Sequence, residues 1–130
     1  MTESGTKKTI YIVDDNETNL IVAENALIDS YNVFTLSSAA SMFNLLGNIV
    51  PDLILLDILM PEMDGFEVYS KLRQIVLLRE TPIVFLTSVN VTDTIQKAMN
   101  IGAVDYIVKP YNKKDLLNRI KSVIKNQKLP

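Results

Sequence analysis

The chain has 130 residues, of which 48% are hydrophobic and 22% are charged, a balance expected for one globular domain rather than a disordered chain. The formal net charge is −2, and the sequence contains neither cysteine nor histidine, which excludes disulfides, thiol catalysis, histidine triads and histidine-ligated zinc. The polar start MTESGTKK is unlike a signal peptide, and no apolar run is long enough to span a membrane, so we expect a cytoplasmic protein.

Short apolar runs alternate with helical spacing five times along the chain. The runs that predict strands cover residues 9–13, 31–36, 52–56, 82–86 and 103–108. Continuous apolar strands separated by amphipathic helices are typical of a buried parallel sheet that is covered by helices. The sequence therefore predicts an α/β fold with a doubly wound, five-stranded parallel sheet, (βα)5. The spacing alone allows the strand order 2-1-3-4-5 or the other common doubly wound order.

The predicted helices and the ends of the chain complete this outline. After the third strand, one helix is predicted to carry the apolar residues Phe66, Tyr69, Leu72 and Val76. We expect residues 1–8 to form an N-terminal tail, 9–126 the domain, and 127–130 a tail or the start of a linker. Residues 113–130 carry six Lys or Arg against one acid, and a solvated helix face explains this excess better than an anionic partner.

Polar side chains follow four of the five predicted strands. The first strand ends in Asp14-Asp15, the third in Asp57, the fourth in Thr87-Ser88, and the fifth in Lys109-Pro110. Each has an ordinary explanation alone, such as Asp15 or Asn16 capping the next helix. Together they place carboxylates, a hydroxyl and an ammonium at the carboxyl edge of one sheet, where ligands bind in this class of fold.

Three carboxylates in one place repel one another, and a hard divalent cation would relieve that repulsion. With such a cation bound, Asp57 could attack phosphorus and form an aspartyl phosphate. Lys109 and the Thr87 hydroxyl would then face the developing phosphoryl charge. The predicted chemistry is therefore phosphoryl transfer to Asp57.

Four stretches give the chain a resemblance to a known family. They are VDD (13–15), LLDILMPEMDG (55–65), PIVFLTS (82–88) and GAVDYIVKPY (102–111). From about Lys8 to about Asn126, the sequence resembles a response-regulator receiver domain of bacterial two-component signalling, similar to the chemotaxis-type regulators. The resemblance implies the flavodoxin-like strand order 2-1-3-4-5, for which a member of this family is a standard example.

The resemblance also implies roles for individual residues. Asp57 would be the phosphoacceptor, and Asp14, Asp15, Asp57 and the backbone carbonyl of Leu59 would hold Mg²⁺ (or Mn²⁺). Lys109, with a cis bond to the following proline, would bind the phosphoryl group.

Further implied roles concern the conformational switch and the lifetime of the phosphorylated state. Thr87 and Ser88 would contact the phosphoryl group, and Thr87 and Tyr106 would act as switch residues. Leu59 and Val89 occupy the positions nearest the expected approach of water to phosphorus. Because neither side chain can orient a water molecule, we expect a long-lived phosphorylated state.

The resemblance implies a signalling receiver rather than an enzyme with a substrate of its own. The expected phosphodonor is a histidine kinase or a histidine phosphotransfer protein, and the expected target is an output domain or a downstream protein. We expect no direct nucleic-acid binding and no membrane contact by this domain. A homodimer that forms on phosphorylation is compatible with the family, whereas the cognate kinase and the output are not encoded in recognisable motifs.

Three other functions compete with this interpretation. A haloacid-dehalogenase-type phosphatase also uses an aspartate nucleophile, but it needs a second acid where this chain has Leu59. A flavin-binding flavodoxin-like protein needs a phosphate-binding loop after the first strand, where the acids of residues 14–17 would repel phosphate. A degenerate receiver that serves only as a scaffold is disfavoured by the intact set of acids.

Overall fold

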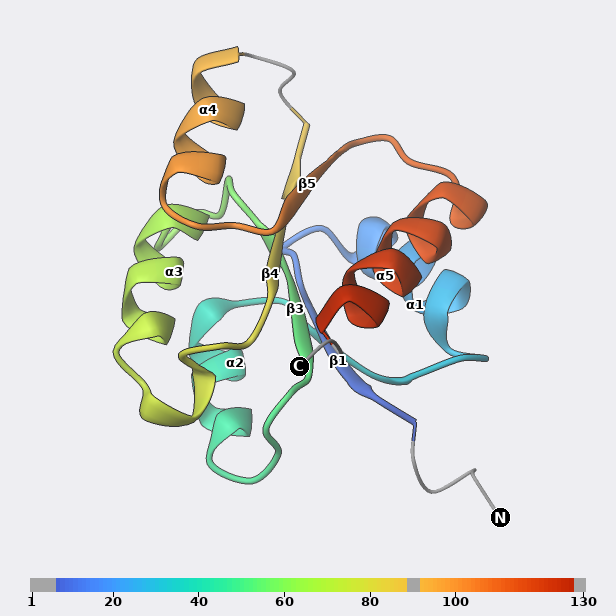
Figure 1. Cartoon of the computed structure of the whole chain (residues 1–130), viewed down its shortest axis with the longest axis horizontal. Helices are drawn as coiled ribbons and strands as arrows, with labels where there is room; N and C mark the ends of the chain where they lie inside the picture. The colour runs from blue at the N-terminus through green and yellow to red at the C-terminus, as the bar shows by residue number, and fades with distance from the viewer. Residues whose placement is uncertain (1–6, 89–91, 128–130) are drawn as a thin grey trace.

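The structure is a computed structural model, and residues 7–88 and 92–127 are described (Figure 1). Its elements in chain order are β1 (Thr9–Val13), α1 (Glu17–Leu27), β2 (Asn32–Leu36), α2 (Ala39–Leu46), β3 (Leu53–Asp57), α3 (Gly65–Arg73), the 3₁₀ helix η2 (Val76–Leu78), β4 (Ile83–Thr87), α4 (Thr92–Asn100), β5 (Asp105–Val108) and α5 (Lys113–Gln127). The five predicted strands are confirmed, with ends that differ from the prediction by no more than two residues.

The strands form one parallel sheet in the order β2-β1-β3-β4-β5, which confirms the doubly wound, flavodoxin-like fold. The chain moves outward from β1 in both directions, so the strand order reverses between β1 and β3. In β3 all five residues are buried, which agrees with its continuous apolar sequence. The carboxyl ends of β1, β3, β4 and β5 therefore meet at one edge of the sheet.

Helices cover both faces of the sheet (Figure 1). The side chains of Ile10 and Ile12 point to the face that α1 and α5 cover, whereas Tyr11 and Val13 point to the face covered by α2, α3 and α4. This alternation follows from the two-residue repeat of a strand. Two apolar cores result, and together they hold the strand ends in fixed positions.

One predicted helix is shorter than the sequence suggests. The prediction extended it to Val76, but α3 ends at Arg73 and Val76 lies in η2 with 71% of its surface exposed. The Arg73 guanidinium donates hydrogen bonds of 2.8 Å to the carbonyl oxygens of Leu78 and Thr81. These bonds fold the chain back so that Leu78, not Val76, enters the core.

Candidate phosphoryl and metal site

Three carboxylates lie together at the carboxyl edge of the sheet. Asp14 follows β1 directly, and Asp57 is the last residue of the neighbouring β3, where Val13 pairs with Leu56. Carboxylate oxygens of Asp14, Asp15 and Asp57 all lie within 4.8 Å of one another. Asp14 and Asp57 are buried, while Asp15 is exposed and opens the cluster to solvent. The structure thus brings together the three acids that the sequence singles out.

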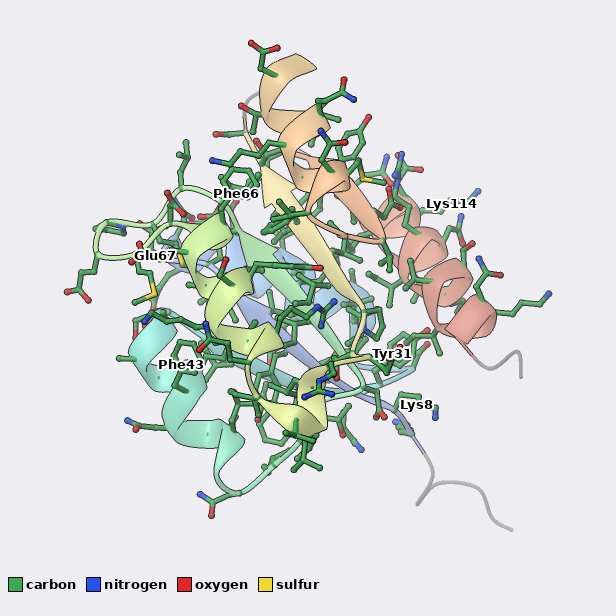
Figure 2. All side chains as sticks on the ribbon, turned by 60° about the vertical axis from the view of Figure 1, so that its left-hand side comes forward. Lys8, Tyr31, Phe43, Phe66, Glu67 and Lys114 are labelled. Atoms are coloured by element: carbon green, nitrogen blue, oxygen red, sulfur yellow. The ribbon has the colours of Figure 1, made fainter. Side chains whose placement is uncertain are left out.

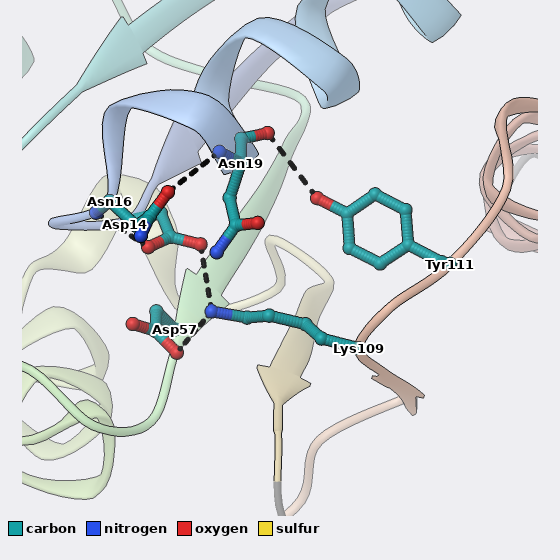
Figure 3. A network of polar contacts seen from close by, with 6 residues as sticks. All are labelled: Asp14, Asn16, Asn19, Asp57, Lys109 and Tyr111. Atoms are coloured by element: carbon teal, nitrogen blue, oxygen red, sulfur yellow. Dashed lines mark hydrogen bonds and ion pairs between the residues drawn. The ribbon is translucent and has the colours of Figure 1, made fainter.

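Lys109 completes this cluster from the end of β5. Its ammonium nitrogen lies 2.9 Å from Asp14 Oδ2 and 3.2 Å from Asp57 Oδ1, between the two carboxylates (Figure 3). Its backbone N–H donates a 2.7 Å hydrogen bond to the carbonyl oxygen of Thr87, which fixes the lysine beside β4. The peptide bond between Lys109 and Pro110 is cis.

Burial and charge oppose each other in this cluster. Burial and, second, the charge of Asp14 raise the pKa of Asp57 to about 6, even though Lys109 acts to lower it. Burial alone would lower the pKa of Lys109, but its hydrogen bonds and charge contacts with Asp14 and Asp57 raise it overall. Three carboxylates and one ammonium have a formal charge of −2. A divalent cation would neutralise that charge, and oxygen donors are those that Mg²⁺ prefers.

The loop that follows Asp57 is held close to the strand end. The Gly65 N–H donates a 2.7 Å hydrogen bond to the carbonyl oxygen of Ile58. A Cβ atom at Gly65 would lie 2.6 Å from the Asp57 carbonyl oxygen and 2.8 Å from Ile58 Cα, so only glycine fits there. Asp64 caps α3 by accepting a hydrogen bond from the Glu67 N–H. The dipeptide Asp64-Gly65 therefore fixes the loop beside the acidic cluster.

The remaining predicted residues divide into two groups. Leu59, Ser88 and Pro110 line the same open cleft as Asp15, Asp57 and Lys109. Thr87 is buried at the end of β4, whereas Tyr106 is half-buried in β5 and packs against the core under α2, α3 and α4. Val89 lies outside the described residues. The roles that the resemblance assigns to these side chains stay predictions.

Three residues that border the cluster, Asn16, Asn19 and Tyr111, were not predicted to take part in the site. Asn16 caps α1 by accepting from the Asn19 N–H at 3.0 Å, and its own N–H donates to Asp14 Oδ1 at 2.9 Å. The Tyr111 hydroxyl donates to the Asn19 carbonyl oxygen at 3.5 Å (Figure 3). Burial, together with the smaller effects of the Asp14 and Asp57 charges, raises the pKa of Tyr111 to about 12. The sequence signals for Tyr111 were its place two residues after Lys109 and its position at the end of the stretch GAVDYIVKPY.

Comparisons with known proteins identify the family. A family model described as the response regulator receiver domain matches residues 10–121. This chain belongs to that family. It is therefore the receiver domain of a two-component response regulator, a signalling domain.

Relatives of this receiver domain occur as parts of different proteins. It is 36% identical over 122 residues to a probable transcriptional regulator, ycf27, of Guillardia theta, covering 92% of this chain and 46% of that protein. It is 32% identical over 120 residues to a probable cyclic di-GMP phosphodiesterase of Vibrio cholerae, covering 92% of this chain and 27% of that protein. The chain thus spans less than half the length of either relative.

Solved structures agree with the fold. The chemotaxis response regulator CheY4 of Vibrio cholerae is 28% identical with a TM-score of 0.85, covering 91% of this chain and 99% of that one. A CheY-like receiver domain from Methanospirillum hungatei is 30% identical with a TM-score of 0.84, covering 94% and 97%. Among the described residues, each helix is too short or too polar to cross a bilayer.

Proposed function

We propose that this receiver domain accepts a phosphoryl group on Asp57 in a Mg²⁺-dependent reaction, with Mn²⁺ as an alternative ion. The observation that carries the proposal is a buried carboxylate, Asp57, in a site whose formal charge is −2 and whose cleft is open to solvent. Such a site is electrostatically frustrated until a divalent cation binds. An aspartate that only capped a helix or formed a turn would not need to be buried beside other carboxylates.

In the proposed reaction, a carboxylate oxygen of Asp57 forms a bond to phosphorus while the P–N bond of a phosphohistidine breaks. The electron pair of that bond leaves on the imidazole nitrogen, which takes up a proton. Asp14, Asp15, Asp57 and the backbone carbonyl of Leu59 are the proposed ligands of the ion. A bound Mg²⁺ would neutralise charge on the carboxylates and on the phosphoryl oxygens.

Lys109 would exchange part of its contact with Asp57 for a phosphoryl oxygen, since its ammonium already lies at that carboxylate. Thr87 and Ser88 at the end of β4 would donate hydroxyl hydrogen bonds to the same group. Support comes from a solved neighbour, the BeF3-activated DrrB receiver domain, which is 25% identical with a TM-score of 0.84. The proposed donor is a histidine kinase or a histidine phosphotransfer protein.

The proposed output is a change in the surface formed by α4, β5 and α5. Thr87 pairs with Val108 across β4 and β5, and Tyr106 pairs with Phe85 two residues earlier in the register. Movement of Thr87 toward a phosphoryl group would therefore be felt directly by β5. We expect this shift to bias two conformations that already interconvert, and to act on an output domain, a downstream protein or a second copy.

The proposal is tested by incubating the protein with acetyl phosphate and Mg²⁺ and measuring the intact mass. We expect one phosphoryl adduct in the wild type, none in Asp57→Asn, and none in the wild type when EDTA replaces Mg²⁺. The matched control is Asp64→Asn, because that exposed residue follows in the same loop and asparagine still caps a helix. A single adduct that persists in Asp57→Asn would assign the phosphoacceptor elsewhere.

A further inference from the structure

Four lysines line one shallow basin at the amino ends of the strands, opposite the acidic cluster. Lys7 and Lys8 precede β1, and Lys121 and Lys125 lie on α5, with Ser30 and Tyr31 of the α1–β2 turn between them. Figure 2 shows Tyr31 and Lys8 near the C-terminal end of α5, while Lys114 lies toward the other end of that helix. The basin is therefore remote from the acidic cluster at the carboxyl edge.

The backbone that carries these lysines is fixed by the fold. The Asn32 N–H donates to the Lys8 carbonyl oxygen at 2.9 Å, and the Asn32 side-chain amide donates to the Lys7 carbonyl oxygen at 3.2 Å. Lys121 and Lys125 are four residues apart in α5, so their side chains leave the same side of the helix. The lysines are thus gathered by the tertiary structure and not by their order in the sequence.

Within the described parts of the chain, the lining of this basin contains only positive charge, although Lys8 also borders a neighbouring hollow that Asp52 and Glu80 line. No carboxylate in residues 7–88 and 92–127 lines the basin, and no ion pair in these residues involves its lysines. Lysines near the C-terminal end of a helix complement its dipole, which accounts for Lys125. That effect does not explain Lys7 and Lys8, which lie on an extended segment.

We infer that this basin binds a small anion that carries two or more phosphate groups. Clustered ammonium groups repel one another, and an anionic ligand removes that repulsion. Lysine binds phosphate as a point charge, and the hydroxyl groups of Ser30 and Tyr31 can donate to phosphate oxygens. A compact polyphosphate matches several charges within one shallow hollow better than an extended acidic peptide does. This binding site is separate from the proposed phosphorylation of Asp57.

The test is a titration with tripolyphosphate, in which amide chemical shifts report binding. EDTA is present so that no metal occupies the acidic site. We expect saturable shifts at residues 7–8, 30–32 and 121–125, with the apparent affinity falling as salt rises. The double variant Lys121→Gln/Lys125→Gln should bind roughly tenfold more weakly, or about 1.4 kcal/mol. Lys113→Gln/Lys114→Gln is the matched control, because it removes the same charge near the start of the same helix.

Three results would overturn the inference. One is an equal loss of affinity in the control variant, which would show that only net charge matters. Another is an absence of saturable shifts in the basin. The third is tighter binding of an oligoglutamate of matched charge, which would indicate an acidic protein segment as the ligand. Thermal melts without tripolyphosphate check that both double variants fold.

Discussion

The strand β3 carries one aspartate at each end, and the two residues behave differently. Asp52, just before the strand, is exposed and accepts a 2.7 Å hydrogen bond from the Thr9 N–H. Asp57, its last residue, is 3% exposed and lies against Asp14 and Lys109. Asp52 thus remains in contact with solvent and satisfies one backbone N–H group at the start of β1. Asp57 is kept in a position where its charge costs energy, which is consistent with the chemical role proposed for it.

The same contrast recurs at the two ends of β5. At its start, Asp105 pairs with Arg119 at 3.1 Å, and half of the Arg119 side chain is exposed. Just beyond its end, Lys109 pairs with Asp14 and Asp57, and only 12% of the Lys109 side chain is exposed. At the amino edge of the sheet, water therefore screens the paired charges. At the carboxyl edge the charges are largely buried, so each is compensated mainly by its charged neighbours.

Replacement of Lys109 is expected to have the largest effect on the stability of the protein. In EDTA at pH 7, Lys109→Met should lower the free energy of unfolding by about 3 kcal/mol, because it leaves two buried carboxylates unpaired. Arg119→Met removes the exposed pair at the other end of the strand and should cost less than about 1 kcal/mol. Urea unfolding followed by circular dichroism measures both changes. Equal costs would mean that Lys109 does not compensate the buried acids.

The fold and the central acids were predictable from the sequence for a simple reason. Strand runs such as LILL (53–56) are continuous because β3 is buried on both faces, and the ends of parallel strands must meet at one edge. That Asp14, Asp57 and Lys109 lie close together follows from that rule alone. Their distances and the pKa of Asp57 do not, since these depend on burial that only the packed helices produce.

Residues whose contacts depend on local chain direction were not predictable. Val76 continues the apolar spacing of α3, yet the hydrogen bonds of Arg73 to later carbonyl oxygens end that helix first. Tyr111 approaches α1 through a contact with Asn19, which is 92 residues away in the sequence. The basic basin was also invisible as a cluster, because it joins Lys7 and Lys8 to α5 through the tertiary fold.

Neutralising Asp57 should stabilise the metal-free protein. Its pKa is raised from 3.8 to about 6 in the folded state, so the ionised form opposes folding. The destabilisation is absent below about pH 3.8, grows as the pH rises through the folded pKa, and is complete above it. Asp57→Asn should therefore raise the free energy of unfolding by about 2 kcal/mol at pH 7 in EDTA. The gain should fade as the pH falls toward 4.

Asp52→Asn is the control for this measurement, because it removes the same charge from the exposed end of the same strand. We expect it to change stability by less than about 1 kcal/mol, without the growth of the effect between pH 4 and pH 7 that is expected of the Asp57 variant. Urea unfolding at several pH values in EDTA separates the two. A stabilisation by Asp57→Asn that is the same at pH 4 and pH 7 would show that charge is not its cause.

The smallest expected effect concerns how long the proposed phosphoryl group persists. Leu59 lines the cleft beside Asp57 and is 57% exposed, so its side chain can cover the phosphoryl group with apolar surface. Hydrolysis needs a water molecule placed in line with phosphorus, and leucine cannot orient one. Leu59→Asn should shorten the half-life roughly fivefold, a change of about 1 kcal/mol in the barrier. Adding Val89→Glu should shorten it further.

Leu77→Asn provides the comparison from the other edge of the sheet, because Leu77 is even more exposed, at 73%, and lies in η2. It should leave the half-life unchanged, since a polar side chain there cannot reach the phosphoryl group. The measurement follows loss of the Asp57 adduct by intact mass after the phosphodonor is removed. Because Leu59 is solvent-exposed, Leu59→Asn should leave stability nearly unchanged, so a faster loss reports water access and not unfolding. Equal half-lives in the wild type and Leu59→Asn would reject the shielding role of Leu59.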